Sequence, residues 1–266
     1  MGAKARNLAY GAESGMTTMS VSVTVLGAGD AFASKGWFQA GYIINANGRR
    51  VLMEAGPTLL ASMKRLGLAP DDLDVVLISH LHGDHFGGLP FLILEYLYES
   101  PRRRKLTLAG PPHLEERTWE LFRTMYPESD TSEISRYLEF VELEPERSQE
   151  LAGAVQVRSI RTPHTVKDLS LAFRVELGGK VIVFSGDTGW TDELISLSAG
   201  SDLFLCECTY FDQPRLDFHI SYVHFMSQRH RFSARRLVLT HIGREVLERR
   251  SEVSLEMAAD GMVIEV

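Results

Sequence analysis

The sequence predicts an α/β fold in which β-sheets pack together and are covered by helices. The chain has 266 residues and is 44% hydrophobic, which is enough apolar surface for a substantial core. Short segments rich in valine, isoleucine, leucine and phenylalanine alternate with amphipathic segments of helical length. Glycine and proline are spread evenly and no repeat or linker divides the chain, so we expect one domain over residues 19–266.

Each element is assigned from its composition and its flanking residues. Because these runs are short and apolar, β-strands are expected at residues 21–26, 41–46, 50–54, 74–79, 105–109, 137–143, 154–160, 169–176, 180–185, 203–208, 236–240 and 262–266. Amphipathic helices are expected at residues 57–66, 87–98, 113–125, 191–198, 222–232 and 244–249. In the first of these helices Pro57 stands in the first turn and Gly67 can end it.

Bulk properties limit the function classes. Residues 1–18 lack the apolar stretch of a signal peptide and are expected to form a disordered tail, with Met16 and Met19 as candidate natural starts. A net charge of −7 and a pI near 5.7 provide no whole-molecule field that attracts nucleic acid or anionic membranes, and no apolar run could span a membrane. The only cysteines, Cys206 and Cys208, exclude a disulfide framework and favour a cytoplasmic location; we interpret them as buried packing rather than metal ligands.

The most informative segment is His80-Leu81-His82-Gly83-Asp84-His85, which directly follows the apolar run 75–79. A strand delivers such a cluster to the open edge of a sheet. Imidazoles suit zinc and similar metals, and a carboxylate beside them allows a second ion nearby. The segment therefore predicts a metal site and hydrolysis by metal-activated water.

Three more candidate ligands stand at the exits of predicted strands. His164 follows the strand at 154–160, Asp187 follows the run 181–186, and His241 follows 236–240. Strand ends and their loops are where α/β proteins place their sites. An isolated histidine or aspartate there is usually a cap or turn residue, but the cluster at 80–85 makes the metal interpretation the favoured one.

In order and spacing, the segment 80–85, then His164, Ser185-Gly186-Asp187-Thr188 and Thr240-His241, resembles the metallo-β-lactamase superfamily. The resemblance covers nearly the whole chain from Val21. It implies the αββα sandwich of that fold, two mixed β-sheets flanked by helices, with a two-metal site along one edge.

The resemblance also implies which residues hold each ion. The first ion would be held by His80, His82 and His164, and the second by Asp84, His85 and His241. Asp187 would bridge the two ions. Some oxygen-reducing relatives have glutamate where this set has a third histidine, so hydrolytic zinc is favoured over a diiron redox site. Two divalent ions are therefore expected, Zn²⁺ first, with Mn²⁺ or Fe²⁺ as alternatives.

Two further motifs resemble the ribonuclease Z and phosphodiesterase branch. Residues 205–210, Leu-Cys-Glu-Cys-Thr-Tyr, occupy the place of its Glu-Ala-Thr motif, and His219-Ile220-Ser221 resembles its His-Ser/Thr-Thr element. The resemblance implies that Asp84, Glu207 and His219 form a proton relay to the leaving oxygen, which an imidazole tuned near neutrality can protonate. The alternatives are a surface or capping role for His219 and a buried ion pair with an arginine for Glu207.

Some segments depart from the pattern of this branch or remain open. Glu54 stands where the family usually has aspartate, and the short interval from His164 to Asp187 leaves no room for the tRNA-binding arm of ribonuclease Z. The basic run 102–105 could grip phosphates, but a solvated loop is favoured, as it is for the arginines near His241. Phe32, Trp37 and Phe38, at residues 32–38, are candidates for an apolar pocket wall, with core packing an equal alternative.

The leading hypothesis is a cytoplasmic dinuclear metal-dependent phosphodiesterase that uses a metal-bridging hydroxide and the proton relay on a small or medium phosphodiester. A ribonuclease Z-like tRNA 3′-end endonuclease, a lactone or thioester hydrolase, and a non-catalytic metal-binding accessory protein of a biosynthetic pathway are the alternatives. RNA is a weakly supported partner because the chain is acidic. No membrane partner is expected, and a homodimer is expected only by analogy.

Overall fold

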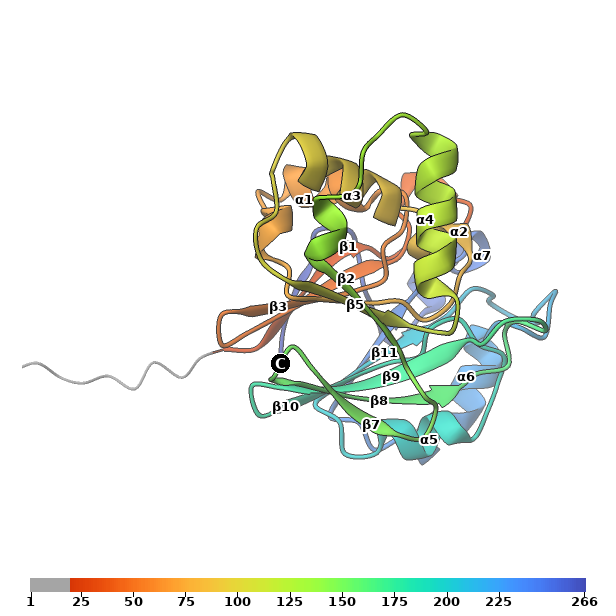
Figure 1. The fold of residues 1–266 in the computed structure, drawn as a ribbon. Helices are drawn as coiled ribbons and strands as arrows, with labels where there is room; N and C mark the ends of the chain where they lie inside the picture. Colours follow the sequence, from red (N-terminus) through yellow and green to blue (C-terminus); the bar gives the residue numbers. More distant parts are fainter. Residues whose placement is uncertain (1–19) are drawn as a thin grey trace, which may run out of the picture.

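Two seven-stranded β-sheets form the centre of the structure, a computed structural model that describes residues 20–266 (Figure 1). In spatial order the first sheet consists of β14 (Val263–Glu265), β1 (Ser22–Gly27), β2 (Gly41–Ala46), β3 (Arg49–Met53), β4 (Val75–Leu77), β5 (Leu106–Gly110) and β6 (Leu138–Glu142). The second sheet consists of β13 (Glu256–Met257), β12 (Arg236–Thr240), β11 (Leu203–Glu207), β10 (Lys180–Phe184), β9 (Leu171–Leu177), β8 (Val155–Arg161) and β7 (Ser148–Leu151).

Helices cover the outer face of each sheet. The helices are α1 (Leu59–Arg65), α2 (Gly83–Phe86), α3 (Leu89–Tyr98), α4 (Leu114–Met125), α5 (Glu193–Ser198), α6 (Tyr222–Gln228) and α7 (Arg244–Glu248). Short 3₁₀ turns lie at η1 (Ser34–Gly36), η2 (Pro70–Asp72), η3 (Ile134–Arg136), η4 (Arg229–Arg231) and η5 (Arg250–Glu252). Figure 1 shows α1, α3 and α4 over the first sheet and α5 and α6 over the second, so the predicted αββα sandwich is confirmed.

The strands are apolar on both faces because both faces are buried. In β2, Tyr42 and Ile44 pack into the core between the two sheets, whereas Ile43 packs under the helices of the first sheet. This alternation follows from the two-residue period of a strand. Central strands therefore read as continuous apolar runs, which is why they were recognisable in the sequence.

All of the predicted strands and helices are present with small shifts at their ends. Gly67 follows α1 with a φ of 68°, as a helix-ending glycine does, but α1 begins only at Leu59, so Pro57 lies before the helix rather than in its first turn. The sequence did not predict β7, whose residues are mostly polar, the two-residue β13, or α2, which is a single turn inside the metal motif.

The structure leaves the predicted tail and domain boundary untested. The predicted disordered tail at 1–18 lies outside the described residues, and the single domain over 19–266 stays a prediction. Within the described part, no helix combines the length and apolarity needed to cross a membrane. The interval between His164 and Asp187 is occupied by β9 and β10, joined by a two-glycine turn at 178–179.

The topology brings several strand ends to one edge. In the first sheet β4 is parallel to β3 and β5, and in the second β10, β11 and β12 are mutually parallel. The chain leaves β4 toward His80, β10 toward Asp187 and β12 toward His241. Carboxyl ends of parallel strands meet at the same edge of a sheet, so the fold itself gathers these side chains.

The basic run at 102–105 is solvated at Arg103, Arg104 and Lys105, as favoured from the sequence, but Arg102 is an exception. Arg102 is only 1% exposed, and its guanidinium donates hydrogen bonds to the carbonyls of Leu73 at 2.7 Å and Lys105 at 2.8 Å. These carbonyls directly precede β4 and β5, so Arg102 lies at the amino ends of the parallel strands. His80 lies at the opposite end of β4. Arg102 therefore links the segments that lead into β4 and β5, at a distance from the candidate site.

The arginines near His241 are also placed away from it. Arg231 pairs with Asp192 and Arg235 with Asp202, while Arg236 forms two contacts with Glu256. Arg235 and Arg236 stand at the amino end of β12, whereas His241 follows its carboxyl end. These cations satisfy surface carboxylates instead of reaching a substrate phosphate.

Arg102→Met should lower the free energy of unfolding by about 2–4 kcal/mol, because it leaves buried carbonyls without a donor. The control is Arg103→Met, since the Arg103 side chain is 62% exposed and its ion pair is with the exposed Glu133. That change should alter stability by less than about 0.5 kcal/mol. Urea unfolding of both variants measures the difference, and equal midpoints would contradict the structural role of Arg102.

Candidate metal centre

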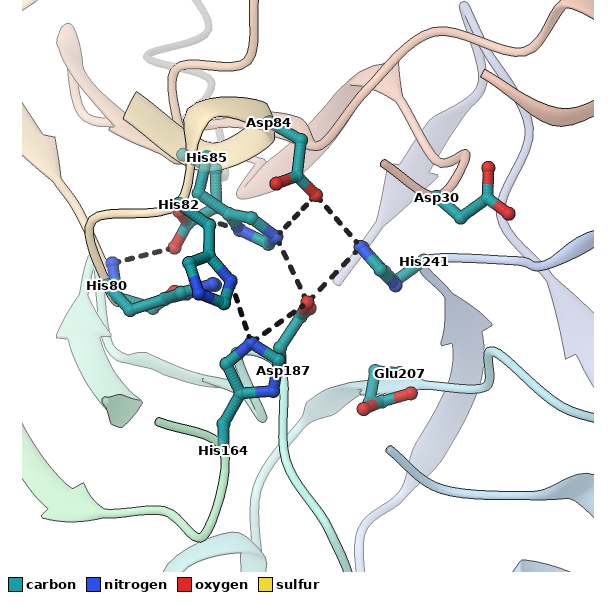
Figure 2. Close-up of polar contacts among 12 residues, drawn as sticks. Asp30, His80, His82, Asp84, His85, His164, Asp187, Glu207 and His241 are labelled. Atoms are coloured by element: carbon teal, nitrogen blue, oxygen red, sulfur yellow. Dashed lines mark hydrogen bonds and ion pairs between the residues drawn. The ribbon is translucent and has the colours of Figure 1, made fainter. Parts of the chain in front are cut away.

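The candidate site lies where strands of both sheets end. His80 comes two residues after the Ile78 that extends β4, and His164 follows β8. Asp187 follows β10, Glu207 is the last residue of β11, and His241 follows β12. Figure 2 shows His164, Asp187 and His241 pointing toward one another from separate elements, with Glu207 beside them. The structure thus brings together residues that are far apart in the sequence.

The gathered side chains form four overlapping groups, in each of which the ligand atoms lie within 4.8 Å of one another, and two of these groups lack His219. The first group is His80, His82 and His164, and the second is Asp84, His85, Asp187 and His241. These are the two groupings that the resemblance implied for two ions.

Asp187 lies between the two groups. Its Oδ2 is 3.3 Å from Nε2 of His85 and 3.3 Å from Nε2 of His241, and 3.8 Å from Nε2 of His164 (Figure 2). The side chain is 3% exposed. A buried carboxylate at this point can contact cations on both sides, which is the position that a bridging ligand needs.

Four of the five candidate ligand imidazoles are oriented from behind through Nδ1. Nδ1 of His164 donates to the carbonyl of Phe218 at 2.9 Å, which leaves Nε2 as the coordinating atom. Oxygen partners stand behind three more rings in the same way: Ser79 Oγ at 2.9 Å from His80, Glu54 Oε2 at 3.1 Å from His85 and Thr209 Oγ1 at 3.0 Å from His241. His82 differs, because its Nδ1 lies 3.0 Å from Nε2 of His164. Fixing Nδ1 sets the tautomer and aims Nε2 into the centre.

Glu54, which stands where the family usually has aspartate, supports both groups. Its fully buried carboxylate accepts from the backbone N–H of Ser79 at 2.9 Å and contacts Nδ1 of His85 at 3.1 Å. Glu54 has a left-handed φ of 65°, and its side chain spans the distance from β3 to both partners. Burial raises the pKa of Glu54, although His85 acts in the opposite direction.

The residues present fit a metal centre. Among the described residues, Nε2 of His80 and Oδ1 of Asp187 are buried and have no hydrogen-bond partner. Leaving such atoms unpaired is costly unless a cation completes their coordination. A set of imidazoles and carboxylates is the donor chemistry of zinc and related divalent metals.

Ion pairs among the candidate ligands balance charge within the centre. Burial lowers the pKa of His85, but the carboxylates of Asp187 and Asp84 outweigh it and raise that pKa well above its usual value. The same balance raises the pKa of His241 through Asp187. Burial alone would raise the pKa of Asp187, yet His241 and His85 hold it well below its usual range.

Glu207 and His219 form a direct pair beside this centre. Nδ1 of His219 is 2.9 Å from Glu207 Oε1, which also accepts from the backbone N–H of Thr188 at 3.0 Å. The partners of buried Glu207 are therefore His219, Thr188 and Thr209, and not the arginine of the alternative interpretation. Burial lowers the pKa of His219, but Glu207 overcomes this and raises it to about 9.

The third predicted member of the relay lies on the other side of the centre. Oδ2 of Asp84 is 3.2 Å from Nε2 of His85 and 3.4 Å from Nε2 of His241. These contacts place Asp84 among the ligands of the second group. The hydrogen-bonded part of the relay in this structure is the Glu207–His219 pair.

Thr209 is a site residue that the sequence reasoning did not single out. Its hydroxyl lies 3.0 Å from Glu207 Oε2, 3.3 Å from His219 Nδ1 and 3.0 Å from His241 Nδ1. One hydroxyl therefore connects the proton-relay pair to a metal-group histidine. The signal was its place two residues after Glu207, as the last position of the motif at 207–209.

A pocket of about 200 Å³ opens above these residues and is lined by Asp84, Asp187, His219 and His241 on the polar side. Of the three aromatic residues proposed for its wall, only Phe32 lines it. Trp37 packs against two hydrophobic cores, and Phe38 lies under the guanidinium of Arg65 at 5.0 Å.

Comparison with known proteins gives a family and a fold. The family model described as Anti-Pycsar protein Apyc1 matches residues 21–259. An Anti-Pycsar protein Apyc1 from Bacillus phage 010DV004 is 28% identical over 217 residues, covering 77% of this chain and 84% of that protein. The uncharacterised protein Rv1339 of Mycobacterium tuberculosis is 29% identical over 232 residues, covering 85% of this chain and 82% of its own length.

Solved structures agree with this fold. The short form of human tRNase Z superposes with a TM-score of 0.71 at 25% identity, covering 91% of this chain and 98% of that one. The chain therefore belongs to the Anti-Pycsar protein Apyc1 family, within the ribonuclease Z and phosphodiesterase branch of the metallo-β-lactamase superfamily, and is a metal-dependent hydrolase of the phosphodiesterase type.

Proposed function

We propose that this protein is a dinuclear metal phosphodiesterase that hydrolyses a small phosphodiester, with a cyclic nucleotide as the substrate class. The observation that carries the proposal is the Glu207–His219 pair beside Asp187, with His219 Nδ1 2.9 Å from Glu207 and 3.9 Å from Asp187 Oδ2. A phosphodiester has a poor alkoxide leaving group, which needs a proton donor at this place. The family match favours the cyclic nucleotide.

The two ligand groups would hold two divalent cations, Zn²⁺ first, with Asp187 between them. Such ions supply charge neutralisation for the phosphate oxygens and activation of water as the nucleophile. The chain contributes the geometry: Glu54, Thr209 and the carbonyl of Phe218 fix the imidazole rings from behind. A preorganised site avoids rearrangement during the reaction.

His219 would protonate the leaving oxygen. Its Nδ1 is committed to Glu207, so Nε2 is the nitrogen available to the substrate. Two cations bound nearby would lower the pKa of His219 from about 9 toward neutrality, the range in which an imidazole works well as a general acid. Glu207 then stabilises the charged ring before the proton leaves.

The alternatives have less support. A tRNA endonuclease would use basic residues near the site, but the run at 102–105 lies at the opposite end of the strands, and the cations beside the site, such as Arg215, pair with carboxylates. Ring opening of a lactone does not require the proton donor that Glu207 holds in place. A non-catalytic binding protein would not require that pair either.

The substrate class is tested by incubating the purified protein with zinc or manganese and 3′,5′-cyclic nucleotides, a precursor tRNA, or a lactone. Conversion of cyclic nucleotide to monophosphate, with the tRNA left intact, is the expected result. Rapid lactone cleavage without any phosphodiester turnover would refute the proposal.

Zinc binding at pH 7 should release protons, because His85 and His241 have raised pKa values and must become neutral to coordinate. Affinity should therefore fall as the pH is lowered. Calorimetric titration of metal-free protein in buffers of different ionisation enthalpy measures the release and should give two ions per chain. The exposed His230 lies on η4, so His230→Ala should release as many protons as the parent. Heats that are independent of buffer would contradict the expectation.

His219→Ala should retain both metals yet slow the hydrolysis of a cyclic nucleotide by roughly 10²–10⁴-fold, the usual effect of losing a general acid. A p-nitrophenyl phosphodiester has a better leaving group and should be affected much less. His224→Ala is the matched control, because His224 is exposed and stacks on Trp190. Equal losses on both substrates would argue against proton donation.

A further inference from the structure

An unusual share of the exposed apolar side chains of this protein surrounds one pocket. Nine large hydrophobic side chains are exposed among the described residues, and three of them, Phe32, Leu216 and Phe218, line the pocket above the metal groups. Phe32 is 85% exposed, the highest value among them. Exposed apolar residues that cluster at a cavity mark a binding surface, whereas single ones need no explanation.

The loop that carries Phe32 is held in place by Asp30. The Asp30 carboxylate, itself 3% exposed, accepts from the backbone N–H groups of Phe32 at 3.2 Å and Ser34 at 3.0 Å, and from the Ser34 hydroxyl at 2.8 Å. Such a turn fixes the backbone while leaving the Phe32 ring in solvent. The exposure of Phe32 is therefore built into the loop.

Further apolar lining of the pocket comes from the segment after β11. Leu216 is 55% exposed, Phe218 is 41% exposed, and the partly exposed Tyr210 lines the same pocket. The floor consists of Asp84, Asp187 and the histidines. The pocket thus has a charged floor and an apolar mouth.

A second cavity of about 770 Å³ shares Phe32, Tyr210 and Leu216 with the first and extends away from the metal groups. Each of its three cations has a carboxylate partner: Lys35 pairs with Glu248 at 3.0 Å, Arg215 with Glu245 at 2.8 Å, and Arg244 with Glu248 at 3.1 Å. The region beyond Phe32 therefore offers space and apolar contact more than free charge.

We propose that Phe32 is a specificity-determining residue that stacks on the planar base of the substrate, with Leu216 and Phe218 providing further apolar lining. A phosphodiester bound at the charged floor directs its uncharged organic part to the mouth, where the exposed aromatic ring stands. Stacking on a nucleic-acid base is tolerant of base identity, so Phe32 selects for a flat heterocycle rather than for one base. Asp30 is the positioning residue for this contact. The inference rests on the proposed phosphodiesterase function.

Zinc-loaded Phe32→Ala tests the proposal. Its KM for a 3′,5′-cyclic nucleotide should rise by about 5- to 150-fold with kcat nearly unchanged, the range observed when a stacking aromatic residue is truncated. Calorimetry should show a matching loss of affinity for the nucleoside monophosphate, and unchanged affinity for inorganic phosphate. Phe32→Tyr should retain the parent KM.

Tyr98→Ala is the matched control, because Tyr98 is 63% exposed on α3 and its hydroxyl contacts only Ser129. It should change neither constant. An unchanged KM in Phe32→Ala, or an equal loss of inorganic phosphate binding, would overturn the stacking role. So would a change of oligomeric state in sedimentation, since the apolar mouth would then be covered by a second copy of the chain. If the parent protein does not hydrolyse any cyclic nucleotide, the proposed function is wrong. That outcome is distinguishable from a parent that is active and a Phe32→Ala variant with an unchanged KM.

Discussion

The electrostatic balance around one buried carboxylate determines the arrangement of the site. Asp187 is almost fully enclosed, and a carboxylate in such a place is stable only when cations or donors meet it. His85 arrives from the first sheet and His241 from the second, each within 3.3 Å of the same oxygen. The two sheets must therefore meet at this edge with their strand ends in register. The packing of the two sheets and the assembly of the metal groups therefore both depend on the contacts of Asp187 with His85 and His241.

Local sequence pattern was sufficient to predict most of the fold and the candidate ligands. Central strands are buried on both faces and so appear as apolar runs, and the histidine cluster follows one of them directly. Features that depend on distant partners could not be predicted. A basic run looks the same whether it is solvated or, like Arg102, bonded to the carbonyl of Leu73, 29 positions earlier. The role of Thr209 likewise exists only because β11 and β12 end side by side.

The protein carries a net charge of −7, yet its substrate under the proposed function is an anion. The local environment of the pocket resolves this conflict. The imidazoles of His85 and His241 lie against the carboxylates of Asp84 and Asp187, so charge is balanced locally within the centre. Divalent ions bound there would supply the local positive charge for an anionic substrate, and a long-range attractive field is not needed.

Ser79 connects the two halves of the centre through the main chain. Its backbone N–H binds Glu54, which holds His85, while its hydroxyl holds His80. Ordering either imidazole therefore restrains the same peptide unit that supports the other. Under the proposed function with two ions, a first ion would lower the conformational entropy that a second ion must still remove. Occupancy of the two positions would then be cooperative, and the singly loaded protein would be a minor species at equilibrium.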